Sequence, residues 1–369
     1  MKAIVSINSI LRTARKIRFN LWMLEGEERA SKKNISILCL GGGAEKTYIA
    51  DLAFNGAYRE TLIGKKWIWN LHRVMVQRMA DIAVVTNSGP LLYRYLSDGK
   101  EFYIPNWVQG EIVFSEVLAR MKTSSHLKSD LRRIRKNEFK YELTKSPSKY
   151  DEFYNTMYLP YISKVYGRTA HLMSYDRMKE LEGQSELMLI TRHGEPLAGQ
   201  ILVYEKDRVR CWSIGVKDGN REYVKMGAQA ALYWYEIQYL SECGYKAMHV
   251  GVSRPFLRDG VLQFKNKWGM NMLQPTRKGL LLKPLRKSEG AMSFLENNPF
   301  IDYESERYVG IIFSDSGASA ASYRNLCAPY FSFGLNKLML YSNRFNDENS
   351  AVSNFMDDKI AIASTDVLF

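Results

Sequence analysis

Residues 251–269 read GVSRPFLRDGVLQFKNKWG and directly follow the alternating segment YKAMHV at residues 245–250. The alternation predicts a strand, which then meets Pro255 and the turn pair Asp259-Gly260. A plain surface loop would be more polar, and a plain helix would not open on proline and Asp-Gly. We therefore expect a strand end that opens into a shaped loop and a short helix over residues 261–268, a kind of place where binding residues often lie.

Three strands and one long helix are expected before this stretch. Residues 186–219 (ELMLITRHGEPLAGQILVYEKDRVRCWSIGVKDG) alternate or are apolar in three runs, with RHGEP and EKD as the turns between antiparallel strands. Residues 220–245 predict a single long helix that Gly244 terminates. Residues 279–285 (GLLLKPL) are expected to close the same domain as a strand.

The start of the long helix is the expected donor site. The first N–H groups of a helix are unpaired and its dipole is positive there, so a pyrophosphate or an acyl carbonyl oxygen can bind. Small residues let a ligand approach the backbone, and Gly227 and Ala228 stand here just after a cation, Lys225. The residues expected to bind the donor are Lys225, Met226, Gly227 and Ala228. Small residues that serve only helix packing remain the alternative.

A family resemblance rests on residues 215–269, with a helix after three strands, GY before a strand, GVS at its end and DG…FK.KWG after it. This pattern resembles the GNAT-like transferase domain of the Fem family, which includes peptidoglycan-bridge aminoacyltransferases and relatives described as acetyltransferases of polysaccharide pathways. Residues 129–143 (SDLRRIRKNEFKYEL) also resemble the basic helix that opens the second domain of those proteins. The resemblance covers residues 128–285 and implies an α+β fold of tandem GNAT-like acyltransferase domains, with mixed, mostly antiparallel sheets flanked by helices.

The domain boundaries that follow are a GNAT-like domain over residues 1–125, the domain with the motifs over residues 126–288, and a strand-helix-strand extension with a frayed tail over residues 289–369. The implied activity is N-acyl transfer from acyl-CoA, acetyl-CoA first, to an amine of a cell-envelope sugar or amino compound. The acceptor is a small molecule or a nucleotide-linked sugar. The glutamine- or arginine-rich phosphate signature of single-domain GNAT proteins (Q/RxxGxG/A) is incomplete in this chain.

Direct transfer needs a deprotonated amine and a hydrogen-bond donor for the developing oxyanion, and no covalent intermediate. The residues expected to act in catalysis are Asp259, His249 and Tyr223. The residues expected to contact substrate are Tyr158, Tyr161, Tyr166, Arg168, Trp212, Gly251, Ser253, Lys265 and Trp268. For Asp259 the plain alternative is a helix cap, for His249 a structural histidine, and for the tyrosines a place at the core boundary.

The net charge of +13 indicates an anionic partner. Residues 124–144 predict an amphipathic helix whose cations would face phosphates, RNA or only solvent. An aminoacyl-tRNA-dependent ligase and a catalytically inactive RNA-binding protein are the two other functions considered, although a stable nucleic-acid partner is not expected. Peripheral contact with an anionic membrane is a further candidate, through the basic N-terminus.

The four cysteines are scattered and none forms a CxxC pair, which argues against a disulfide framework or a zinc site. The five histidines show no metal-ligand spacing, and no metal is expected. No apolar run reaches the roughly 18 residues of a membrane span. We expect a cytoplasmic protein, with the inner face of the membrane as a second location.

Overall fold

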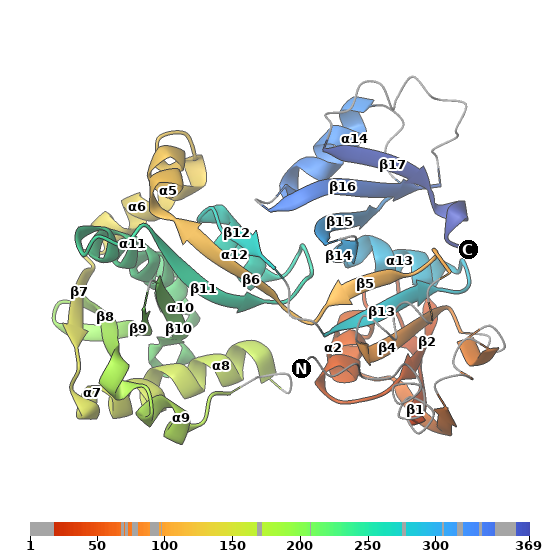
Figure 1. Ribbon diagram of the computed structural model, residues 1–369, viewed down its shortest axis with the longest axis horizontal. Coiled ribbons are helices and arrows are strands. Elements are labelled where there is room, and N and C mark those ends of the chain that lie inside the picture. Colours follow the sequence, from red (N-terminus) through yellow and green to blue (C-terminus); the bar gives the residue numbers. More distant parts are fainter. Residues whose placement is uncertain are drawn as a thin grey trace, which may run out of the picture. The chain divides into compact units, whose positions relative to one another are not determined.

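The computed structural model describes residues 18–67, 70, 73–75, 80–88, 96, 98–167, 172–206, 208–274, 278–304, 306–315, 320–331, 334–343 and 359–369. The chain forms two compact units (Figure 1). The first unit contains residues 1–108, 254–262 and 274–369, and the second contains residues 109–253 and 263–273. Neither unit is one continuous stretch, so the units cross the boundaries expected at residues 125 and 288.

The first unit is built on two sheets. The larger has the strand order β3-β1-β2-β4-β13-β5 and the smaller the order β14-β15-β16-β17. The strands of the larger sheet are β1 (Arg18–Glu27), β2 (Asn34–Leu40), β3 (Arg59–Trp67), β4 (Ile82–Ser88), β5 (Phe102–Pro105) and β13 (Gly279–Pro284). Those of the smaller are β14 (Phe300–Glu304), β15 (Arg307–Phe313), β16 (Leu335–Ser342) and β17 (Ile360–Ser364). The helices of eight or more residues in this unit are α2 (Ala44–Ala53), α13 (Glu289–Asn297) and α14 (Ala320–Cys327).

The second unit is a seven-stranded sheet of order β12-β6-β11-β10-β9-β8-β7. Its strands are β6 (Val108–Val113), β7 (Lys140–Thr144), β8 (Ser185–Arg192), β9 (Glu195–Glu205), β10 (Arg208–Val216), β11 (Ala247–Ser253) and β12 (Asn271–Leu273). Its helices are α5 (Phe114–Met121), α6 (Ser125–Lys136), α7 (Pro147–Glu152), a π-helix (Phe153–Tyr158), α8 (Leu159–Tyr166), α9 (Tyr175–Lys179), α10 (Arg221–Met226) and α11 (Ala228–Glu242). Helix α12 (Gly260–Lys267) runs from the first unit into the second.

Helices cover both faces of the second sheet. On one face the apolar side chains of Ile201 and Val203 pack with Phe153 and Met157 of the π-helix. Side chains alternate along a strand, so Leu202 and its cross-strand neighbour Cys211 point to the other face. Helix α11 packs on β8 and β9, and α6 packs on α11. This two-sided covering explains why the strands β8 and β9 are almost continuously buried.

The α+β class with mixed, mostly antiparallel sheets flanked by helices is confirmed. Strands β8, β9 and β10 pair antiparallel in sequence order, as their alternation predicted. Pro160 lies in the first turn of α8, directly after the π-helix Phe153–Tyr158. The helical backbone continues through this point, so the missing N–H of proline removes one helical hydrogen bond, and the irregular π-turn lies just before it. The predicted strand-helix-strand of the C-terminal segment is present as β15, α14 and β16.

Three expectations need correction. The long helix over residues 220–245 is two helices, because Gly227 adopts a left-handed conformation with φ 101° between α10 and α11. Strand β13 does not join the sheet of β8–β10; it lies between β4 and β5 in the first unit. The expected fraying of the tail is wrong for residues 360–364, since β17 pairs parallel with β16 there. The basic N-terminal segment, residues 1–17, lies outside the described residues.

Candidate functional site

The site begins where α10 ends and α11 starts. Gly227 is the N-cap of α11, and its left-handed φ of 101° is a conformation that glycine adopts without strain. Within the described residues no side chain caps this helix start. The first N–H groups of α11 therefore have neither an intrahelical acceptor nor a side-chain cap, and we call this end the open helix start, although Ala228 itself is buried.

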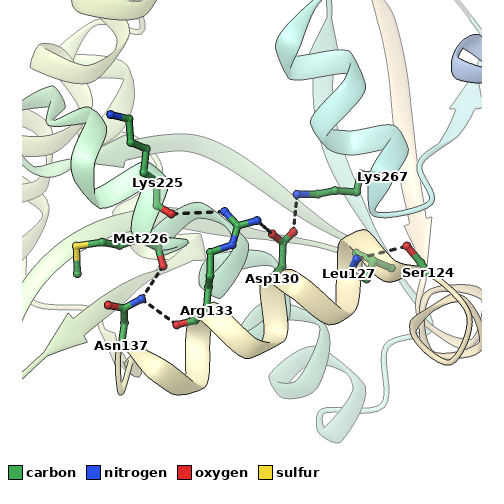
Figure 2. Close-up of polar contacts among 8 residues, drawn as sticks. All are labelled: Ser124, Leu127, Asp130, Arg133, Asn137, Lys225, Met226 and Lys267. Carbon is green, nitrogen blue, oxygen red and sulfur yellow. Dashed lines mark hydrogen bonds and ion pairs between the residues drawn. The ribbon is translucent and has the colours of Figure 1, made fainter.

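Helix α6 holds this junction in place (Figure 2). Arg133 donates from its guanidinium to the Lys225 carbonyl at 3.4 Å, and Asn137 donates its side-chain amide to the Met226 carbonyl at 3.0 Å. Both carbonyls belong to the last turn of α10, where acceptors lack helical partners. Arg133 and Asn137 lie four residues apart, so they share one face of α6.

Asp130, on the same helix, forms an ion pair with Arg133. Its carboxylate is 2% exposed and pairs with Arg133 at 2.9 Å and with Lys267 at 2.5 Å (Figure 2). Two cations offset the desolvation of one buried carboxylate. The guanidinium of Arg133 is thereby held against the α10–α11 junction.

Strands β10 and β11 stop pairing near the junction. They pair parallel at Val209 with Met248 and at Arg210 with His249, and the pairing stops there although both strands continue. A bulge at Ser213, with φ 56°, shifts the register of β10 against β9. Gly251 in β11 has φ 70°, which again suits glycine. The carboxyl-terminal halves of two neighbouring parallel strands thus leave backbone groups that do not pair with one another.

The open helix start lies at this same edge of the sheet. Because β10 and β11 are parallel, the chain between them must return from the carboxyl edge to the amino edge. Helix α11 makes that return, so Ala228 is at the edge where β10 and β11 separate. Crevices at the carboxyl ends of parallel strands are common ligand sites.

His249 lies on β11 beside Arg210 of the neighbouring strand. Burial lowers the pKa of His249, and the cations Arg208, Lys265 and Arg210 lower it further. Its Nδ1 accepts a hydrogen bond from the Gly251 N–H at 3.2 Å. A neutral imidazole that accepts at Nδ1 carries its proton on Nε2. In this arrangement His249 offers a hydrogen-bond donor and not a basic nitrogen.

Tyr161 reaches the first turn of α11. Its hydroxyl accepts a hydrogen bond from the side-chain amide of Gln229. Burial raises the pKa of Tyr161, so it stays a neutral phenol at neutral pH. Of the tyrosines expected to contact substrate, the structure therefore places this one beside the open helix start.

Further along α11 lies a buried acid. Glu236 is 0% exposed, and neither carboxylate oxygen has a hydrogen-bond partner within the described part of the chain. Burial raises the pKa of Glu236 to about 8, while the neighbouring Cys211 thiol acts in the opposite direction. Burial also raises the pKa of Cys211 well above its usual value, which disfavours a nucleophilic thiolate there.

Other residues expected at the donor or substrate sites have other partners. Lys225 pairs with Glu222 through its Nζ at 2.7 Å, so its charge is already matched at the surface. Lys265 is 6% exposed and donates to the Val252 carbonyl at 2.8 Å. Ser253 is 2% exposed, and within the described chain its Oγ has no hydrogen-bond partner.

Asp259 acts as a helix cap. Its Oδ1 accepts from the N–H groups of Val261 at 3.1 Å and Leu262 at 2.9 Å, the pattern of an N-terminal cap on α12. The structure therefore favours the structural alternative that the sequence had left open for this residue.

The expected aromatic contacts divide into core and boundary residues. Tyr158 is 4% exposed and its hydroxyl accepts from the Met173 N–H at 2.7 Å, so it is a satisfied core residue. Trp268 is 0% exposed and packs 5.8 Å from the Tyr233 ring. Trp212 is half-buried and has the Arg210 guanidinium 4.9 Å from its ring centroid. Tyr223 is half-buried on α10.

Two predicted residues cannot be placed. Arg168 and the side chain of Tyr166 lie outside the described residues. In the ranges that the structure does describe, there is no cluster of three or more histidine, cysteine, aspartate or glutamate side chains fit to hold a metal, and no helix is long and apolar enough to cross a membrane.

The sequence missed Arg133, Asn137 and Gln229. Arg133 looked like one of several solvated cations, and only the contact of α6 with the α10–α11 junction shows that its guanidinium meets the Lys225 carbonyl. One signal was present: Arg133 and Asn137 are four residues apart, offset from the other cations of the helix. Gln229 directly follows the Gly-Ala pair that the sequence did single out.

Comparison with known proteins gives matches among solved structures. No protein-family model and no curated protein matches the chain. The structure of L-PGS from Bacillus licheniformis matches with a TM-score of 0.36 and 11% identity, over 72% of this chain and 85% of that one. FemX matches with a TM-score of 0.34 and 10% identity, over 70% of this chain and 83% of that one. A tandem GNAT protein from the clavulanic acid biosynthesis pathway matches with a TM-score of 0.30 and 9% identity, over 71% of this chain and 82% of that one.

The Fem and GNAT types that the sequence resembles are thus both found among these structures. The TM-scores are below 0.5, so these matches support no statement about the chemistry of this chain. Its function has to be argued from its own residues.

Proposed function

We propose that this chain is an N-acyltransferase that moves an acyl group from acyl-CoA to an amine of a small acceptor, such as a cell-envelope sugar or amino compound. The observation that carries this proposal is the coincidence of two features in the second unit. Strands β10 and β11 cease to pair at the edge where α11 begins without a side-chain cap. The strands that stop pairing could bind an extended ligand with amide groups. The uncapped helix start could bind an anion.

Coenzyme A has both parts. Its pyrophosphate would accept hydrogen bonds from the first turn of α11, where Gly227 has no side chain to obstruct it. Its pantetheine arm carries amides, which would hydrogen-bond to backbone groups where β10 and β11 no longer pair with each other. The thioester would then lie near Gly251 and His249 of β11.

The chemistry requires little more than positioning. The amine attacks the thioester carbonyl, the carbon–sulfur bond breaks, and the amine proton passes to the leaving thiolate, which gives an amide and free thiol. The Nε2–H of His249 is proposed to donate to the developing oxyanion, because its Nδ1 already accepts from Gly251. In this scheme Asp259 is a cap rather than a base. The roles of Tyr223, Tyr161 and Ser253 stay predictions.

Release of free thiol from acetyl-CoA tests the proposal, measured with a panel of amino sugars, nucleotide-linked amino sugars and amino acids. Thiol release that depends on one acceptor, with an acetylated product of matching mass, is the expected result. Thiol release that does not depend on an acceptor, or no release with the whole panel, would count against it.

A second candidate is transfer from aminoacyl-tRNA. The exposed cations of α6, Lys128, Arg132, Arg135 and Lys136, favour it, since they would meet a polyanionic donor. The same assay with charged tRNA in place of acetyl-CoA separates the two donors.

A further inference from the structure

A groove of about 560 Å³ lies in the second unit, between the end of α6, α11 and the turn between β8 and β9. It is distinct from the α10–α11 junction, which α6 meets with its other side through Arg133 and Asn137. The groove combines aromatic and basic side chains: Phe139, Trp234 and Tyr235 with Arg135, Lys140 and His193.

A hydrogen bond holds one ring of the aromatic part, that of Tyr235. The Tyr235 hydroxyl donates to the Phe139 carbonyl at 2.5 Å, which fixes one ring. The ring of Tyr141, 39% exposed, lies 5.1 Å from that of Tyr235. Partly exposed rings at a groove form a surface on which a planar base can stack.

The basic part continues along α6. The exposed cations Lys128, Arg132, Arg135 and Lys136 follow the spacing i, i+4, i+7, i+8, which places them on one face of the helix. Lys140 follows just after the helix. None of these five forms an ion pair with any residue that the structure describes. At 1.5 Å per residue, Lys128 and Lys136 are about 12 Å apart along the helix, too far for one phosphate group to bridge.

The cations of this face form a continuous cluster without an acid among them. Some exposed cations elsewhere in the same unit are matched by an acid three residues away, as in Lys149 with Glu152 at 3.0 Å and Arg208 with Glu205 at 2.6 Å. The acid of α6, Asp130, is 2% exposed and lies on the opposite, buried side. Favourable interaction with the helix dipole covers only the last turn, so it does not account for Lys128.

We propose that this groove and the cation face of α6 bind a single-stranded segment of RNA, with a base stacked in the groove and successive phosphates along α6. The single acid at the rim, Glu138, is exposed and would repel phosphate, but it can accept a hydrogen bond from a ribose 2′-hydroxyl. This surface does not depend on the acyl-transfer scheme, and its binding is measured without any acyl donor.

The test is fluorescence anisotropy of a labelled, unstructured RNA of about twelve nucleotides, within the site sizes of single-strand binders, at several salt concentrations. The variant Lys128→Gln/Arg132→Gln/Lys136→Gln should lower the log–log salt slope by about 2, because each lost phosphate contact removes roughly 0.7. Its affinity at about 0.1 M salt should fall roughly a hundredfold by the same relation.

A matched control removes the same charge from the same unit. The variant Lys149→Gln/Arg177→Gln/Lys217→Gln affects cations that already have acid partners, so it should leave the salt slope unchanged. Trp234→Ala should weaken binding about tenfold with little change in slope, as loss of one stacked base predicts. A melting curve of each variant shows whether it is folded.

Four results would overturn the proposal. One is equal loss of binding in the two triple variants, which would mean that only net charge matters. Another is equal affinity for DNA of the same sequence, which would remove the assignment to RNA. A third is binding of the mononucleotide ADP as tight as that of RNA. The fourth is binding of phosphatidylglycerol vesicles, lost in the first triple variant, with none to RNA.

Discussion

The Asp130 carboxylate forms two ion pairs, with Lys267 at 2.5 Å and with Arg133 at 2.9 Å. The carboxylate is buried, and its two partners come from the end of α12 and from its own helix (Figure 2). These ion pairs connect α6 with α12, and α6 in turn contacts the α10–α11 junction through Arg133 and Asn137.

Asp130→Asn is expected to lower the free energy of unfolding by about 2 kcal/mol, because two cations lose their buried partner yet remain partly hydrated. Urea unfolding measures the change. Glu142→Gln is the control, since Glu142 is exposed on β7 and forms no ion pair with the described residues; it should change stability by less than about 0.5 kcal/mol. Equal effects of the two substitutions would show that the Asp130 pairs do not stabilise the fold.

Gly227→Ala tests the helix junction. A side chain at φ 101° is strained, and a Cβ there would lie 3.4 Å from the Cβ of Arg133. We expect a loss of about 1 to 2 kcal/mol in unfolding free energy. Gly183→Ala is the matched substitution, because its Cβ would meet nothing within 4 Å. A neutral Gly227→Ala, measured by the same urea titration, would contradict the left-handed cap.

Glu236 makes stability depend on pH. Its pKa is about 8 in the folded protein and near 4.5 when unfolded. Between these values the folded state keeps a proton that the unfolded state releases, so stability falls as pH rises from 4.5 to about 8. The unfolding constant should rise up to about tenfold per pH unit from this group. Glu236→Gln removes the titration, so its unfolding free energy should exceed that of the unmodified protein increasingly toward pH 8. A difference that stays constant with pH would contradict the raised pKa.

The sequence predicted the local elements of the second unit well. Alternation over residues 186–219 predicted β8, β9 and β10, because a half-buried strand has a period of two. It did not predict the break at Gly227, because an isolated glycine inside an apolar, helical pattern is compatible with either one helix or two. It also misplaced β13, whose pairing with β4 and β5 joins segments far apart in the chain. Local patterns carry no information about such partners.

The roles expected for the residues of the candidate site stay predictions, and the structure gives the positions of these residues. Gly227, Ala228 and Gly251 were chosen because a ligand needs close approach to the backbone, and the structure places them at the open helix start and on β11. Arg133 and Asn137 could not be separated from the solvated cations of α6 without the packing of that helix. For Asp259 and Tyr158 the residue type suggested a role in catalysis or substrate binding. In the structure the Asp259 carboxylate caps α12 and the Tyr158 hydroxyl accepts from the Met173 N–H.

The most direct test is the melting temperature with acetyl-CoA, since a ligand that binds only the folded state raises it. Gln229→Leu changes the first turn of α11, and Arg133→Gln removes the α6 side chain that contacts the α10–α11 junction. Arg132→Gln is the control, because it removes a neighbouring cation of α6 that lies on the exposed face. We predict a rise with acetyl-CoA that is reduced in Gln229→Leu and Arg133→Gln and unchanged in Arg132→Gln. No rise with acetyl-CoA, together with a rise with tRNA that Arg132→Gln reduces, would contradict the acyl-CoA donor.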